Sequence, residues 1–214
     1  MWRVVLLALS PLPALACDRP VCVVAADPAA FAQVLTFAAN PATLGPGQPV
    51  SGLLTLPGVT FGERFAGQRQ GPDALYDQIS GPAALPVTLL AGAQGRNLSL
   101  LRVFGANLLS GNGPTGYPRD DSTGEGAIAI RFDHNQTAFA LDLVGGEGGQ
   151  AQILFLGPDG AVLDLLTIAP LAEGWLAFQT GQGWPPVLGL VLSNRDTAGI
   201  ALRAVAFDLD ERVS

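Results

Sequence analysis

Lysine is missing from this chain, histidine occurs once and cysteine twice among 214 residues. All eleven basic residues are therefore arginine, and eighteen Asp and Glu outnumber them to give a formal net charge of −7. Nucleic acids and anionic membranes both attract proteins through clustered positive charges. Because this chain is acidic and has no basic stripe, we expect it to bind neither.

The shortage of histidine and cysteine also limits the chemistry. A nucleophilic triad needs a histidine beside a Ser or Cys and a carboxylate, but His134 lies in a polar link and no Gly-x-Ser-x-Gly turn is present. One histidine and two cysteines do not supply the usual ligands of a zinc site. Glycoside hydrolysis needs two carboxylates across a cleft, and the sequence selects no pair among its acids. A glycoside-active enzyme is therefore the third and least favoured functional class.

The first sixteen residues have the pattern of an export signal. Arg3 precedes a short apolar run over residues 4–9, and Ala14, Leu15 and Ala16 form the small-x-small pattern that a signal peptidase cleaves. The run is far shorter than the roughly 20 residues that cross a bilayer. The sequence therefore predicts a signal peptide over residues 1–16. The mature protein is expected to be one domain, residues 17–214, in the periplasm or outside the cell.

The two cysteines lie five positions apart, directly after this segment. In an oxidising compartment, two cysteines and no third favour a disulfide between Cys17 and Cys22. So short a loop stabilises a fold only modestly, and its expected role is to tie down the new N-terminus. The alternative is a lipoprotein anchored through Cys17, because Leu15-Ala16-Cys17 partly matches a lipoprotein signal. That alternative leaves Cys22 as an odd thiol.

Beyond one predicted helical turn at residues 29–33, apolar residues recur with a period of two, as in strands with one face on a core. Residues 126–132 and 137–144 show the alternation most clearly. Alanines such as Ala140 fall on the face opposite the core, where substitution is expected to cost little. The residues expected to share the interior are Ile128, Ile130, Phe132, Phe139, Leu141 and Leu143.

Turn residues connect these strands. The Gly-Pro-Asp-Gly sequence at 157–160 predicts a hairpin between residues 150–156 and 161–168. A change of parity within 200–209 predicts a β-bulge near Arg203. About ten strands with almost no helix predict an all-β fold, a two-sheet antiparallel β-sandwich with jelly-roll topology. Further strand-like runs lie at 34–37, 53–56, 59–65, 86–90, 98–104, 176–180 and 188–193.

The longest irregular stretch, residues 105–125, is the expected binding loop, because long loops in compact domains are usually functional or disordered. Its aromatic, amide, guanidinium and carboxylate groups suit a polyhydroxylated ligand, which offers apolar faces together with hydroxyl donors and acceptors. The alternative is a solvated crossover. The expected ligand-binding residues are Asn112, Tyr117, Arg119, Asp120 and Asp121, with Trp184 outside the loop, where sugar stacking and core capping are equal alternatives.

Calcium is the one cofactor that the sequence suggests. Asp120, Asp121 and Glu125 cluster in the expected loop, and carboxylate oxygens are preferred calcium ligands. Their spacing does not match a dedicated calcium-binding loop, so solvated turn acids are the default interpretation. Asp208 or Asp210 could contribute from the last strand.

Five segments share one further pattern: the Val-Leu-Thr-Phe of 34–37, the Gly-Val-Thr-Phe of 58–61, and residues 126–132, 138–141 and 205–208. Together they resemble exported bacterial β-sandwich proteins of the PEP-CTERM-associated kind. The resemblance implies a lectin-like or carbohydrate-binding-like jelly roll, in a family whose function is mostly unassigned. Two departures are Ala38, where those proteins often carry an acid, and the lack of a C-terminal sorting segment after Asp208.

These observations favour an exported, non-catalytic binding module for glycans or cell-envelope components. The alternative is a structural or assembly protein of the cell surface, in which a sheet edge or face contacts a partner chain. The mature chain is expected to contain no transmembrane segment. Ligand, partner and oligomeric state are not specified by the sequence.

Overall fold

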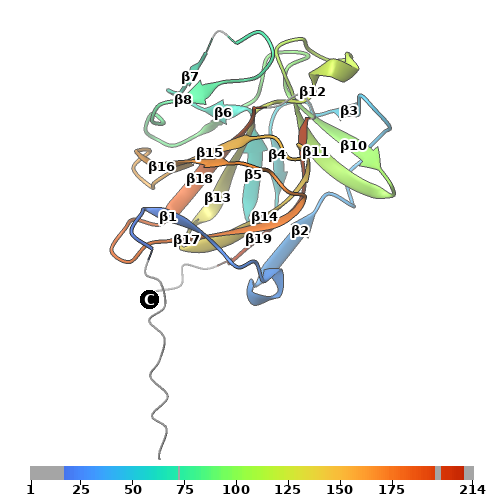
Figure 1. The fold of residues 1–214 in the computed structure, drawn as a ribbon. Coiled ribbons are helices and arrows are strands. Elements are labelled where there is room, and N and C mark those ends of the chain that lie inside the picture. Colours follow the sequence, from blue (N-terminus) through green and yellow to red (C-terminus); the bar gives the residue numbers. More distant parts are fainter. Residues whose placement is uncertain (1–16, 72, 196–198, 210–214) are drawn as a thin grey trace, which may run out of the picture.

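The computed structural model describes residues 17–71, 73–195 and 199–209, so the predicted signal peptide and Asp210 lie outside the described residues. Two antiparallel sheets face each other (Figure 1). The first sheet contains β1 (Val21–Val24), β2 (Gln33–Thr36), β3 (Gln48–Pro49), β10 (Leu98–Val103), β11 (Ala106–Asn112), β12 (Thr123–Gly126), β14 (Ala138–Gly145), β17 (Gly174–Thr180) and β19 (Ile200–Phe207). The second contains β4 (Leu54–Leu56), β5 (Val59–Gly62), β13 (Ile128–Gln136), β15 (Ala151–Leu156), β16 (Val162–Ile168) and β18 (Val187–Asn194).

Smaller elements complete the described chain. Two short strand pairs lie in the segment between β5 and β10. Two 3-10 turns, η1 (Pro28–Ala30) and η2 (Asp120–Ser122), are its helical elements, and no helix among the described residues is long and apolar enough to cross a membrane. The short pairs are β6 (Arg64–Phe65) with β9 (Leu89–Leu90), and β7 (Arg69–Gln70) with β8 (Ile79–Ser80).

Eight of the strands have jelly-roll order. In the first sheet they run β11-β19-β14-β17, and in the second β13-β18-β15-β16, so the chain crosses repeatedly from one sheet to the other. Two interlocked Greek keys of this kind define a jelly roll. The prediction of an all-β, two-sheet antiparallel sandwich is therefore confirmed. The described residues form nineteen strands, more than the expected ten, because several extra strands are only two residues long.

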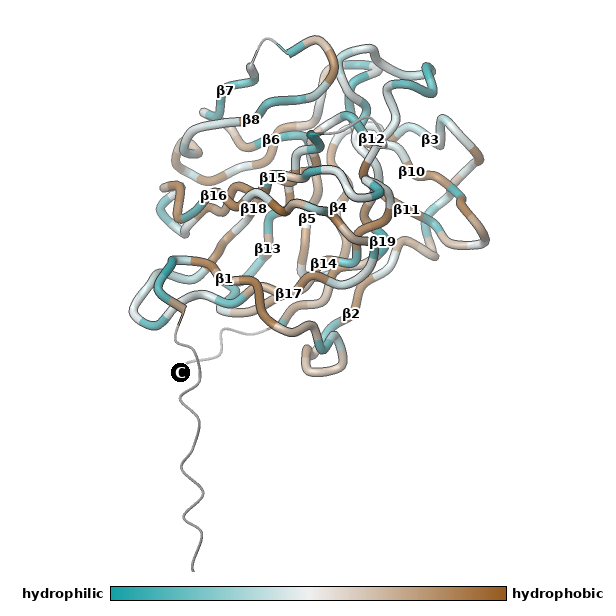
Figure 2. The backbone as a smooth tube through the Cα atoms, viewed as in Figure 1, coloured by the Kyte–Doolittle hydropathy of each residue, from teal (hydrophilic) through white to brown (hydrophobic). Residues whose placement is uncertain are grey.

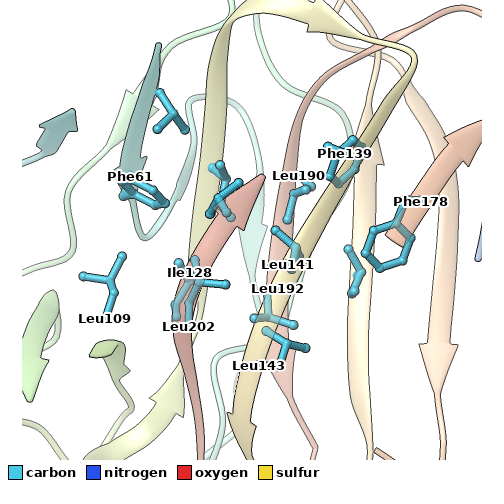
Figure 3. Close-up of a cluster of buried hydrophobic side chains, with 14 of the residues drawn as sticks. Phe61, Leu109, Ile128, Phe139, Leu141, Leu143, Phe178, Leu190, Leu192 and Leu202 are labelled. Carbon is cyan, nitrogen blue, oxygen red and sulfur yellow. The ribbon is translucent and has the colours of Figure 1, made fainter. Parts of the chain in front are cut away.

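The space between the sheets is filled by the predicted core residues. All six apolar residues expected from β13 and β14 belong to one buried cluster (Figure 3). Phe139 lies at its aromatic centre, with its ring centroid 5.2 Å from that of Phe132 and 5.3 Å from that of Phe178. Alternation along the two strands thus identified the interior face correctly.

The opposite faces of these strands are buried as well, which the alternation did not predict. Ala140 is fully buried with Ala177 and Ala206 beneath Phe31 and Trp175. The expectation that Ala140 tolerates substitution is therefore wrong, because outer residues cover it. On the second sheet, β6 to β9 cover the outer face of β13 and β15 and enclose a second apolar cluster of Phe65, Ile79, Ala83, Val87, Leu89, Ala127, Ala129, Leu154, Leu156 and Val191.

Three local predictions are confirmed. The hairpin of β15 and β16 turns at residues 157–160, where Gly160 has φ +76° and the Asp159 carboxylate accepts a hydrogen bond from the Ala161 N–H. The bulge falls at Arg203, which is the extra residue where β19 pairs with β14. Cys17 and Cys22 form a disulfide. The helical turn expected at residues 29–33 forms as η1, which begins one residue earlier and ends three residues earlier.

Candidate functional site

The stretch expected to be a long loop is shorter in the structure. Residues 106–112 form β11 and residues 123–126 form β12, because both segments pair in the first sheet. Only residues 113–122 remain as a connection, and they carry η2 and are hydrophilic at their tip (Figure 2). The expectation of an irregular segment over 105–125 is therefore wrong at both ends. A pocket lies on each side of this connection.

The larger pocket, here called the tyrosine pocket, has a volume of about 570 Å³. Two of the expected ligand-binding residues, Asn112 and Tyr117, lie together on its wall. Its size falls in the range of small-molecule sites, roughly 300–1,000 Å³. The remaining lining residues are Pro49, Val50, Ser51, Gly52, Gly92, Ala93, Gln94, Gly95, Asn97 and Leu98.

Asn97 holds the walls of the tyrosine pocket in place. Its Nδ2 donates to the carbonyls of Val50 at 2.8 Å and Gly52 at 2.7 Å, and its Oδ1 accepts from the Gly92 N–H at 3.0 Å. One amide side chain therefore ties the segment before β4 to the segment before β10. Sequence reasoning did not select Asn97, because nothing near it in the sequence shows that these two segments meet.

Asn112 lines the same pocket and is 1% exposed. Its Nδ2 donates to the Asn97 carbonyl at 2.6 Å and to the Ser99 hydroxyl at 2.7 Å. Its buried Oδ1 accepts no hydrogen bond from any described residue. Buried side-chain oxygens in proteins almost always have a donor, so this unpaired acceptor is the most unusual polar group of the pocket.

Tyr117 is half-buried at the pocket edge. Its backbone N–H donates to the Gly95 carbonyl at 2.6 Å, which fixes the 113–122 connection against the segment before β10. The pocket therefore combines an aromatic ring with amide side chains and backbone groups. Such a set can pack on an apolar surface and exchange hydrogen bonds with hydroxyls.

Arg119 and Asp121 form a bidentate ion pair with each other. The guanidinium donates through Nε at 3.0 Å and Nη2 at 2.9 Å to the two carboxylate oxygens of Asp121. These hydrogen bonds and the charge of Arg119 hold the pKa of Asp121 below its usual range. Both side chains are more than half exposed, and neither lines the tyrosine pocket. The structure thus separates this pair from Asn112 and Tyr117.

The second pocket, of about 320 Å³, lies on the other side of the connection. All three expected calcium ligands, Asp120, Asp121 and Glu125, line it. Glu125 is buried and accepts a hydrogen bond from Asn194 at 2.9 Å. Within the described ranges, no three acidic, histidine or cysteine side chains lie close enough to hold a metal ion. Calcium binding at these acids therefore stays an untested alternative to solvated turn acids. The other lining residues are Leu75, Tyr76, Thr115, Thr123 and Gly199.

Trp184 lies at the opposite end of the sandwich from the connection. It belongs to the turn that leads into β18, whereas Asn194 at the far end of β18 bonds Glu125. Eight strand residues separate the two ends by about 25 Å at roughly 3.3 Å each. The ring is 48% exposed. The structure therefore places Trp184 apart from the other expected ligand-binding residues.

Two buried acids were missed by sequence reasoning. Burial raises the pKa of Glu63, and the charge of Asp77 adds to this effect, while Arg64 opposes it. Burial likewise raises the pKa of Asp77, against hydrogen bonds from the Ala127 N–H and from Arg96. Neither acid lines a pocket described above. No local signal distinguishes them, because only the β6–β9 segment and its packing bury them.

Comparisons with known proteins give structural neighbours only. No family model and no curated protein matches the chain. A carbohydrate-binding module of family 29 is 16% identical, with a TM-score of 0.35, over 71% of this chain and 90% of the module. A variant of a family 29 module complexed with mannohexaose is 14% identical, with a TM-score of 0.34, over 71% and 94%. Similarity at this level assigns neither a function nor a site.

Proposed function

We propose that this chain is an exported, non-catalytic module that binds a polyhydroxylated ligand, a glycan of a cell envelope or matrix, in the tyrosine pocket. One observation carries the proposal. The half-buried ring of Tyr117 and the buried amide of Asn112, which come from different elements, line one pocket of about 570 Å³. Export follows from the expected signal peptide, and the Cys17–Cys22 disulfide is compatible with an oxidising compartment.

The chemistry of the pocket supports a sugar over an apolar ligand. Its walls carry the hydroxyl of Ser51 and the amide of Gln94 beside one aromatic ring. A sugar presents both an apolar face and closely spaced hydroxyls to such walls.

A glycan array screened with the mature protein, followed by titration of the best ligand, tests the proposal. Tyr117→Ala should weaken binding about tenfold or more, because truncating an aromatic side chain that packs on the ligand commonly costs about 1–2 kcal/mol. Its melting temperature should stay close to that of the parent. Tyr76→Ala is the matched control, because Tyr76 is the other tyrosine of the chain and lines the second pocket.

Three results would contradict the proposal. The array could yield no ligand, Tyr117→Ala could leave the affinity unchanged, or Tyr76→Ala could weaken binding equally. Repeating the array with EDTA tests calcium at Asp120, Asp121 and Glu125 in the same experiment. We expect no change with EDTA, because Asp121 is paired with Arg119 and Glu125 bonds Asn194.

An edge strand favours the alternative of an assembly protein. β16 is seven residues long, pairs with β15 on one side, and exposes Val162 and Leu165. Long edge strands with exposed apolar residues can add a strand from a partner chain. Under this alternative, sedimentation analysis should detect association that Leu165→Lys abolishes. A monomer at all concentrations that also captures no partner strand would contradict it.

A further inference from the structure

A row of three side chains crosses the outer face of the second sheet. Arg131 of β13 is paired with Thr60 of β5, and Thr60 is paired with Thr55 of β4. Their neighbours Phe61 and Phe132 point into the core, so the three side chains point outward. The two hydroxyls lie 3.4 Å apart. Strand register therefore aligns one guanidinium and two hydroxyls across three strands.

This row forms one wall of a separate pocket of about 510 Å³, here called the arginine pocket. The opposite wall comes from residues 86–89, in the segment that leads into β9, and it adds the hydroxyl of Thr88. None of the lining residues is acidic. The complete set is Leu53, Thr55, Thr60, Pro86, Val87, Thr88, Leu89 and Arg131.

Arg131 makes no close ion pair of the kind that other arginines on the surface make. Arg19, Arg119 and Arg203 each donate two hydrogen bonds to one carboxylate, at distances between 2.7 and 3.2 Å. In contrast, the nearest carboxylate oxygen to Arg131, from Asp133, is 3.9 Å from Nη1, which is too long for a hydrogen bond. The Nε of Arg131 is buried and has no partner among the described residues.

The arginine pocket continues from the tyrosine pocket along the same two segments. Residues 49–52 line the tyrosine pocket and residues 53 and 55 line the arginine pocket. On the other segment, residues 92–95 line the first and residues 86–89 the second. Between them, the Leu53 side chain and the Leu90 carbonyl fill the space where a Cβ on Gly62 would lie. The two pockets are therefore neighbours along both segments, and an extended ligand that occupies both has to cross these two groups.

We propose that the arginine pocket binds a carboxylate carried by the ligand of the tyrosine pocket, so that the ligand is an acidic, uronate-containing polysaccharide. This inference rests on the proposed function. The fork of a guanidinium matches the two oxygens of a carboxylate, and the Arg131 side chain is about one-third exposed in this pocket. The threonine hydroxyls donate to the carboxylate or to ring hydroxyls of the same sugar.

The test uses oligouronides of several backbones together with their methyl esters, in which each carboxylate has lost its charge and gained a methyl group. The parent protein should bind the best acid at least tenfold more tightly than its ester. Arg131→Gln should reduce that preference to twofold or less while the ester still binds. Arg69→Gln is the matched control, because Arg69 is an exposed arginine on β7 that lines neither pocket. Thr60→Val should reduce the preference in part.

Each outcome separates the two proposals. Equal binding of acid and ester, or an acid preference that survives Arg131→Gln, overturns the proposal for the arginine pocket. If Tyr117→Ala still weakens binding of the ester, the proposal for the tyrosine pocket stands. An acid preference that Arg131→Gln removes while Tyr117→Ala has no effect overturns the tyrosine pocket alone. Sulfated glycans that bind where carboxylated ones do not overturn the carboxylate assignment. Absence of binding to every uronide and ester overturns this inference, and neutral ligands on the array then decide the proposed function.

Discussion

Phe139 offers the sharpest test of how the sandwich is held together. Its side chain is 1% exposed and lies between the sheets (Figure 3). Three rings surround it, with centroids 5.2 Å (Phe132), 5.3 Å (Phe178) and 6.2 Å (Phe155) from its own. Phe178 comes from the same sheet and Phe132 and Phe155 come from the facing one. Phe139→Ala therefore removes contacts that join the two sheets.

The expected cost follows from burial and ring contacts. Large-to-small changes of a buried Phe cost about 3–5 kcal/mol, including the cavity that is left. Aromatic pairs add about 0.5–1.5 kcal/mol beyond the buried area, which places this site near the upper end of that range. Because domains are stable by only about 5–15 kcal/mol, the variant should lose a large part of its free energy of unfolding.

Urea denaturation of the parent, Phe139→Ala and a matched control measures this cost. The control is Phe104→Ala, because Phe104 is fully exposed at the tip of the β10–β11 hairpin. The control should change the free energy of unfolding by about 0.5 kcal/mol or less. The urea midpoint of Phe139→Ala should fall at an unchanged m value. Equal shifts for the two variants would refute the assignment of Phe139 to the centre of the core.

Three further predictions concern charge, the disulfide and the mature N-terminus. The raised pKa of Glu63 means that the folded state holds this proton more tightly than the unfolded chain, so its contribution to stability is full below about pH 4 and falls as the pH rises. Glu63→Gln should therefore gain stability relative to the parent as the pH rises above about 4, and a pH-independent difference in urea midpoints would contradict this. Replacing Cys17 and Cys22 with Ser should cost about 2 kcal/mol or less, because the loop is short. Intact-mass analysis of exported protein should show an oxidised chain beginning at Cys17, and a lipid mass increment would contradict it.

The sequence by itself determined the class of fold and much of its interior. Alternation identified Phe139 and its neighbours because side chains on a strand point to opposite faces with a period of exactly two. The turn at residues 157–160 and the bulge at Arg203 could also be predicted, because both depend on a few consecutive residues. Such features are local, so the sequence around them contains the information that specifies them.

Only the tertiary structure decided which faces are covered and where the pockets lie. Ala140 is buried because Phe31 and Trp175 cover the outer face of the first sheet, and neither is close to it in the sequence. Asn112 and Tyr117 could be predicted as candidates, but Asn97 and Arg131 could not. Their roles depend on segments that meet across β3, β4 and β9, and on the register that aligns Arg131 with Thr60. Long-range strand pairing sets these neighbours, and a period of two within one strand does not specify its partner.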